Sequence, residues 1–139
     1  MNDHQSADRH WPTRLAAATA ASLTVATGLA LRAGAGGELT KYAGDALYTV
    51  LVHTLVVLAA PRVRPVTAAT VALGVSWAVE FLQISDIPAD LSRHSTIARL
   101  VLGSTFNPPD LAWYVVGAAS AWLAHTATIR VFRTRPSVG

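Results

Sequence analysis

One carboxylate interrupts an apolar run that is long enough to cross a lipid bilayer. The run Val66–Ile84 carries no ionisable residue except Glu80. A charge at the centre of a bilayer costs roughly 2.5–3.5 kcal/mol on insertion scales, so acids in such runs usually face a protein interior and serve a function. Gln83 follows three residues later, on the same face of a helix. The chain therefore has to fold so that other polar groups meet this face.

The composition agrees with a chain embedded in a membrane. Only 14% of the 139 residues are charged, whereas soluble domains contain about 25% charged residues. The apolar residues are also grouped in long blocks, which predicts an integral membrane protein with one small all-α domain. Basic residues flank these blocks, so the net charge of +3 reflects membrane topology and predicts no nucleic-acid partner. The absence of cysteine excludes disulfides and thiolate chemistry.

Four apolar blocks predict a four-helix membrane bundle. We expect helices at about residues 15–32, 43–60, 66–84 and 110–129, in one membrane domain over 15–129 between cytoplasmic tails at 1–14 and 130–139. The connection between the third and fourth blocks has apolar positions on one face from about residue 90 to 102, and Gly103 follows as a stop. It predicts a short amphipathic helix on the outer side, near the membrane plane.

The first block admits a second interpretation. Arg14, the apolar stretch after it and the small residues at 33–35 also resemble a secretory signal peptide. The apolar core of such a peptide spans about 7–15 residues. This block is longer, and Arg32 lies between it and the supposed cleavage site. We therefore favour a retained helix.

Basic residues set the expected orientation of the chain. More of them lie in the two tails and the 61–65 turn than on the opposite side, which places both termini in the cytoplasm. The chain is therefore expected to cross the plasma (inner) membrane several times. The first group comprises Arg9, Arg14, Arg62, Arg64, Arg130, Arg133 and Arg135, and the second Arg32, Lys41, Arg93 and Arg99.

Alternation of the helices brings nearly all the conspicuous polar residues of the membrane segments to one level at the outer side. Helical periodicity places them on facing stripes. We expect an outer-leaflet polar pocket that binds through Arg32, Asp45, Tyr48, Glu80, Gln83, Arg93, Asp110 and Tyr114. Glu80 is expected to pair with an arginine, with Arg93 favoured over Arg32, because a guanidinium group would keep a buried carboxylate ionised. Gln83 is expected to help fix the orientation of Glu80.

Members of this set also have purely structural interpretations. Asp110 follows two prolines and suits a helix cap, and Asp45 suits a first helical turn. Glu80 suits a buried ion pair that holds the helices together. His53 and His125 lie deeper, each without an evident second ligand, so no metal site is predicted. The chain contains no phosphate loop, H-E-x-x-H or G-x-S-x-G motif, and no cofactor is expected.

Several strings in the chain occur in the order found in a known family. They are Gly44-Asp45-Ala46-Leu47-Tyr48, Glu80-Phe81-Leu82-Gln83, Arg93, Leu102-Gly103-Ser104-Thr105-Phe106, and Asp110 with Tyr114 and Gly117. Over about residues 31–117 the chain resembles an uncharacterised domain-of-unknown-function family of small bacterial inner-membrane proteins. Members are sometimes labelled ribosomal-maturation proteins, a role that does not suit a chain made almost entirely of membrane segments.

The same order is similar to that of the broader VanZ-like group, which is named for teicoplanin resistance. In that group an acidic residue opens one helix, a Glu-x-x-Gln pair ends another, an Arg follows, and an Asp and a Gly lie on the last helix. This chain departs from the pattern after Asp45, where Ala-Leu-Tyr follows without Lys or His. Tyr114 also stands where an asparagine is usual, and these departures argue against a role in glycopeptide resistance.

Three functions are compatible with these features. The first is a non-enzymatic envelope protein whose pocket binds the head group of a membrane lipid or a lipid-linked cell-envelope precursor. The alternative is a membrane-embedded enzyme that uses Glu80, Asp45 and Asp110 as acid–base groups or cation ligands. The third is a small transporter or an accessory subunit of a membrane complex, although four short helices are few for a transporter and none is plainly broken at mid-membrane.

Overall fold

Helices make up all the regular structure that the computed structural model describes, in residues 10–34, 36–103 and 105–134. They are α2 (Trp11–Gly34), α3 (Glu38–Ala59), α4 (Pro65–Leu82), α5 (Ile87–His94), α6 (Thr96–Leu102) and α7 (Asp110–Thr134). Of these described helices, α2, α3 and α4 are long and apolar enough to cross a membrane. The prediction of an all-α chain is thus confirmed for the described residues. The predicted tails at 1–14 and 130–139 lie partly outside those ranges.

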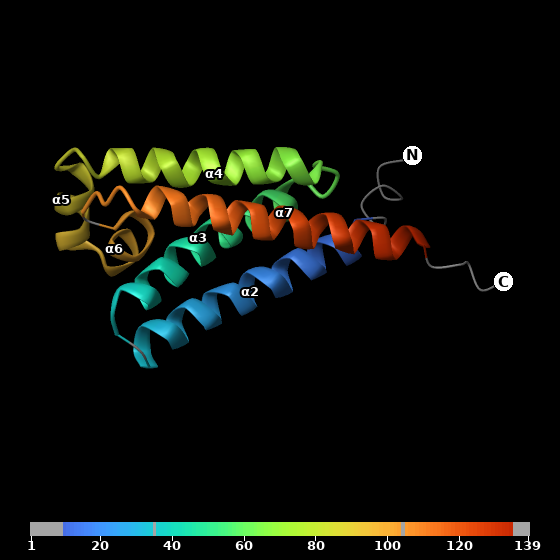
Figure 1. The fold of residues 1–139 in the computed structure, drawn as a ribbon, viewed down its shortest axis with the longest axis horizontal. Helices are drawn as coiled ribbons and strands as arrows, with labels where there is room; N and C mark the ends of the chain where they lie inside the picture. The colour runs from blue at the N-terminus through green and yellow to red at the C-terminus, as the bar shows by residue number, and fades with distance from the viewer. Residues whose placement is uncertain (1–9, 35, 104, 135–139) are drawn as a thin grey trace.

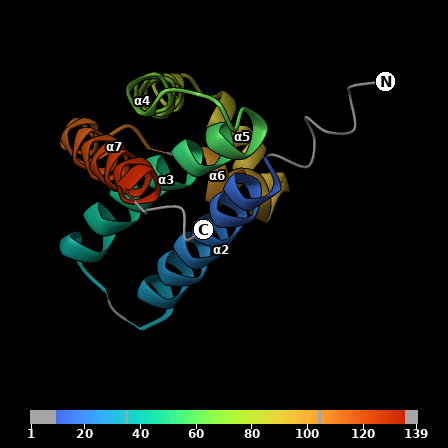
Figure 2. The ribbon, with the colours of Figure 1, turned by 90° about the vertical axis from the view of Figure 1, so that its right-hand side faces the viewer.

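The long helices lie side by side, and the two short helices cover one end of them (Figure 1). α3 contacts α2, α4 and α7, and α4 also contacts α7. Figure 2, seen from the opposite end, shows α3 between α2 and α7. We call the end where α5 and α6 lie the capped end. The start of α2 and the end of α7 lie at the other end (Figure 1).

Small and polar side chains fill the interior, while large apolar side chains face outward. Most buried apolar residues are alanines, namely Ala17, Ala21, Ala68, Ala72, Ala118 and Ala121. The buried polar residues are Thr49, His53, Thr54, Ser76, Glu80 and Asp110. Exposed positions instead hold Leu15, Leu23, Leu29, Leu55, Val66, Val71, Val115, Val116 and Leu123. This distribution is typical of helices that pack closely in a bilayer, where lipid tails surround the large apolar side chains.

Two side-chain contacts cross this interior away from the capped end. Thr49 on α3 and Ser76 on α4 lie 2.9 Å apart between their hydroxyl oxygens. Deeper from the capped end, Nε2 of His53 on α3 lies 3.2 Å from Nδ1 of His125 on α7. No partner for either histidine is evident from the sequence, because 72 residues separate them along the chain. Helix packing brings them together and so ties α7 to α3.

The connection between the third and fourth predicted helices differs from its prediction. One amphipathic helix was expected over about residues 90–102, but α5 ends at His94 and a second helix, α6, begins at Thr96. Ser95 adopts an extended conformation, and its hydroxyl oxygen accepts a hydrogen bond from the backbone N–H of Ala98. A serine in this role caps a new helix, so the chain turns here instead of continuing. Gly103 ends α6 with a φ of 65°, as a glycine stop should.

The contact between α7 and α3 depends on Gly117. This glycine is buried, and a Cβ built on it would collide with the backbone carbonyl of Ala46, lying 2.9 Å from the carbonyl carbon. The two helix backbones therefore approach each other more closely than any other residue at position 117 would permit. The same approach brings Tyr114, one turn earlier on α7, against the interior.

We expect Gly117→Ala to destabilise the protein by about 1–3 kcal/mol, because the added methyl group forces the two helices apart. The measurement is the unfolding free energy in detergent, followed through the helical circular dichroism signal. Gly74→Ala is the matched control, since a Cβ at Gly74 on α4 meets nothing within 4 Å. Equal stability of the two variants would show that the α3–α7 contact is not tight.

Candidate functional site

Glu80 lies in the last turn of α4, and its side chain is buried, with 1% of the residue exposed. Each carboxylate oxygen accepts one hydrogen bond. Oε1 accepts from the backbone N–H of Asn107 at 2.6 Å, and Oε2 accepts from the hydroxyl of Tyr114 at 2.9 Å. Glu80 thereby joins α4 to α7 and to the segment that leads into α7.

The prediction that Glu80 pairs with an arginine, Arg93 or Arg32, is wrong. Arg93 lies on α5 with 73% of its side chain exposed, and it forms an ion pair of 3.4 Å with Asp90. No other arginine in the described ranges lies within salt-bridge distance of Glu80. The backbone at Asn107 and the ring of Tyr114 occupy the positions beside the carboxylate. Two neutral donors satisfy it there without burying a second charge, which would carry its own desolvation cost.

A second acid, Asp110, is paired with a lysine that the pocket prediction did not include. The ammonium group of Lys41 donates to both carboxylate oxygens of Asp110, which is 4% exposed. Lys41 also lies 3.4 Å from Oδ2 of Asp45, one turn further along α3. The side-chain amide of Asn107 donates to Asp110 as well. The lysine therefore lies between two acids from two helices, α3 and α7.

From the sequence, the second helix is expected to begin near residue 43, which leaves Lys41 outside it among the basic residues of the opposite side. α3 instead begins at Glu38, directly after Gly37, whose φ is 107°. A glutamate in a first turn favours helix formation through the helix dipole, and this signal predicts the earlier start. With the earlier start, Asp45 lies in the second turn of α3. Asp110 begins α7, and its side-chain partners are Lys41 and Asn107.

A cavity of about 750 Å³ opens at the capped end between α2, α3, α4, α6 and α7. All the residues of the predicted polar pocket line it except Arg93, namely Arg32, Asp45, Tyr48, Glu80, Gln83, Asp110 and Tyr114. Lys41 and Arg99 also line it. Arg99 comes from α6, so the break of the connection between α4 and α7 into two helices brings a different arginine to the cavity than the one the sequence favoured. We call this space the polar cavity.

Gln83 attaches the end of α6 to the end of α4 and forms no described hydrogen bond with Glu80. Its side-chain amide donates to the backbone carbonyl of Leu102, the last residue of α6. Its amide oxygen is buried without a described partner. A Cβ at Gly103 would lie 2.6 Å from Nε2 of Gln83, so a larger residue would displace this amide, and the φ of 65° also favours glycine. The expected role of Gln83 in orienting Glu80 is replaced by a contact between α4 and α6.

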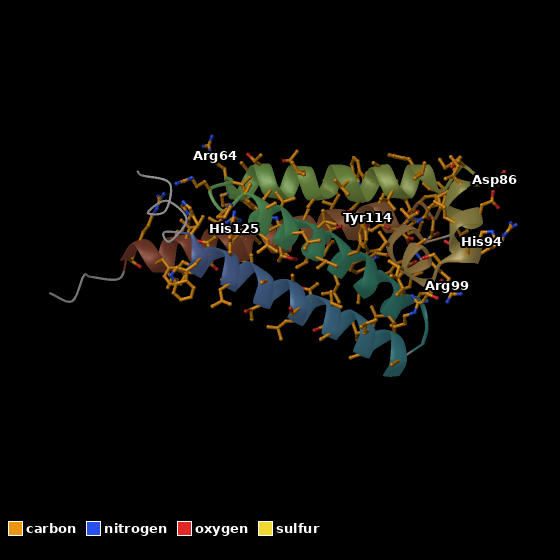
Figure 3. The ribbon with its side chains drawn as sticks, turned by 180° about the vertical axis from the view of Figure 1, so that it is seen from behind. Arg64, Asp86, His94, Arg99, Tyr114 and His125 are labelled. Atoms are coloured by element: carbon orange, nitrogen blue, oxygen red, sulfur yellow. The ribbon has the colours of Figure 1, made fainter. Side chains whose placement is uncertain are left out.

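Charge is distributed unevenly around the polar cavity. Lys41 is held by its two aspartates, and Glu80 is satisfied by neutral donors. Arg32 and Arg99 form no ion pair with any described acid. Figure 3 shows Arg99 at the capped end, Tyr114 between the helices and His125 towards the other end. Within the described ranges the His, Asp and Glu side chains form no group of three that could hold a metal ion.

The chain belongs to a family of proteins of unknown function (DUF2809), whose model matches residues 36–118. The resemblance to an uncharacterised family is thereby confirmed. No curated protein and no solved structure matches the chain. The matched range runs from just before α3 to just after Gly117 of α7. It contains the cavity residues of α3, α4, α6 and α7, whereas α2 with Arg32 precedes it.

We expect Tyr114→Phe to lower the unfolding free energy by about 1–3 kcal/mol, because it leaves one oxygen of buried Glu80 without a donor. Thermal unfolding in detergent measures the loss. Tyr42→Phe is the matched control, since the ring of Tyr42 stacks on Trp113 and keeps that contact without its hydroxyl. Glu80→Gln should lose less than Glu80→Leu, because an amide can accept from Asn107 and donate to Tyr114. Tyr114→Phe as stable as Tyr42→Phe would show that the Glu80 contact contributes nothing.

Proposed function

We propose that this DUF2809 protein is a multi-pass inner-membrane protein whose polar cavity binds the head group of a membrane lipid or a lipid-linked cell-envelope precursor. The single observation that carries the proposal is a cavity of about 750 Å³ with charged walls, inside a set of helices whose outer faces are apolar. Small-molecule sites are typically cavities of about 300–1,000 Å³. The similarity of the Asp45, Glu80 and Asp110 strings to VanZ-like proteins also supports a role at the cell envelope.

The proposal includes a fourth membrane crossing by α7, which completes a four-helix bundle. α7 has 25 residues and packs against α3 and α4, two of the helices that are apolar enough to span. An uninserted α7 would leave the polar groups of α3 and α4, such as Glu80 and His53, facing lipid, at a cost that their burial against α7 avoids. The arginine distribution then directs the capped end outwards and both termini into the cytoplasm.

Binding without catalysis fits the contacts of the acids better than the enzyme alternative does. A general base needs a free lone pair within hydrogen-bond reach of substrate. Glu80 and Asp110 are only 1% and 4% exposed and already accept hydrogen bonds from Asn107, Tyr114 and Lys41, so little of either carboxylate is open to a substrate. Asp45 has the weakest contact of the three acids, with one oxygen 3.4 Å from the same lysine. The acids thus serve mainly to shape the cavity and to position its lysine.

Single-cysteine labelling tests the orientation, because the native chain has no cysteine. We expect His94→Cys, at the exposed end of α5, to react with a membrane-impermeant thiol reagent in intact cells. Arg62→Cys, in the turn after α3, and Arg133→Cys, in the last turn of α7, should react only after permeabilisation. Reaction of Arg133→Cys but not Arg62→Cys in intact cells would show that α7 does not cross the membrane.

Filling the polar cavity tests the proposed function. Gly44 lines the cavity, and a Cβ at this position meets nothing within 4 Å, so Gly44→Phe adds a ring there without a backbone clash. We expect the amount of phospholipid that co-purifies with this variant to fall at least about tenfold, as measured by native mass spectrometry. Gly74→Phe is the control, because Gly74 is equally open but faces away from the cavity. Equal lipid retention by the two variants would refute binding in the cavity.

A further inference from the structure

We infer that the ligand of the polar cavity is an anionic amphiphile, with a phosphate-type head group between Arg32 and Arg99 and an acyl chain in a groove between α2 and α3. The inference rests on the proposed function and specifies its ligand class. It follows from two observations: the two cavity cations that no described acid neutralises, and an apolar groove that shares part of its wall with the polar cavity.

The first observation concerns charge. Three cationic side chains line the polar cavity, and Lys41 contacts Asp110 and Asp45. The guanidinium groups of Arg32 and Arg99 have no acid among the described residues within ion-pair distance. They come from α2 and α6, on two sides of the same space. Guanidinium groups bind phosphate oxygens in a bidentate manner, so two of them on one cavity select an anionic head group.

The second observation concerns the groove. It has a volume of about 600 Å³ and is lined by Ala21, Ser22, Val25, Ala26, Leu29, Leu51 and Leu55. The hydroxyl of Ser22 donates to the backbone carbonyl of Ala18, so its polar group is already satisfied. We call this space the chain groove. Its remaining wall is apolar, as an acyl chain requires.

The polar cavity and the chain groove are adjacent. Val25 and Leu29 on α2 and Leu51 on α3 line both of them. From Leu29 to Ala21 the groove follows α2 for about 12 Å, at about 1.5 Å per residue. One leaflet of a bilayer has a hydrocarbon thickness of about 15 Å. A molecule with its head group at the arginines therefore has its chain in the groove, parallel to the neighbouring lipids, and a free phosphate would leave the groove unused.

The test uses the full-length protein in neutral detergent and compares three probes by native mass spectrometry: phosphatidylglycerol, phosphatidylcholine and glycerol phosphate. We expect phosphatidylglycerol to bind at least about tenfold more tightly than either of the other two. Arg32→Gln and Arg99→Gln should each weaken phosphatidylglycerol binding about tenfold and weaken phosphatidylcholine binding less, because the choline cation offsets the charge of its phosphate. Arg93→Gln is the matched control, because Arg93 is exposed on α5 and does not line the cavity.

A tryptophan tests the chain groove. Ala26→Trp fills the groove from an exposed position and should weaken phosphatidylglycerol binding about tenfold, while glycerol phosphate binding stays unchanged. Ala16→Trp, also exposed on α2 but outside the groove, is the control. Circular dichroism of each variant checks that it folds.

The outcomes separate this inference from the proposed function. If phosphatidylcholine and phosphatidylglycerol bind equally and only Gly44→Phe removes them, head-group binding stands and the anionic ligand is refuted. If glycerol phosphate binds as tightly as phosphatidylglycerol, or Ala26→Trp binds like Ala16→Trp, the chain groove is refuted. If the wild-type protein binds none of the three probes, the inference is refuted, and the proposed function is decided separately by whether Gly44→Phe removes lipid that co-purifies with the protein.

Discussion

The buried carboxylate of Glu80 is the group on which the rest of the structure depends. A carboxylate that is 1% exposed has to be hydrogen-bonded, and its donors are the backbone of Asn107 and the hydroxyl of Tyr114. These donors fix where the chain enters α7 and which face α7 turns towards α4. Asn107 then also donates to Asp110, and Asp110 accepts from Lys41 on α3. One hydrogen-bonded network therefore sets the relative positions of three helices at the capped end.

Small and polar side chains lie between the helices, whereas large apolar side chains face outward. The polar cavity is a consequence of this arrangement. Alanine, glycine and hydroxyl side chains fill the interior, where Gly117 permits contact with the backbone of Ala46. Large apolar side chains cover the outside, where lipid replaces the packing that a soluble protein needs. α2 packs against α3 and diverges from α4 and α7 towards the capped end (Figures 1 and 2). α6, which Gln83 attaches to α4, lines the space between them at the capped end.

The candidate site illustrates which parts of such a network are predictable. Alternation of helices predicted that Asp45, Glu80 and Asp110 belong to one level, and all three line the polar cavity. Their partners were not predictable in the same way. Arg93 was favoured from its sequence position, yet Ser95 breaks the connection and presents Arg99 to the cavity instead. Lys41 was overlooked because its role depends on where α3 begins. Likewise, no local pattern relates His53 to His125, which meet through the packing of α3 against α7.

The sequence alone determined the helical class, the apolar spans and the face on which each acid lies, because these depend on composition and on a period of about 3.6 residues. The tertiary structure decided which donor satisfies each acid. That choice depends on distances between groups far apart in the chain, such as the 34 residues between Glu80 and Tyr114. It also depends on competition between donors for one buried position, where a neutral hydroxyl and a backbone N–H satisfy the carboxylate without the desolvation that an arginine would require. Local patterns carry no information about such competition.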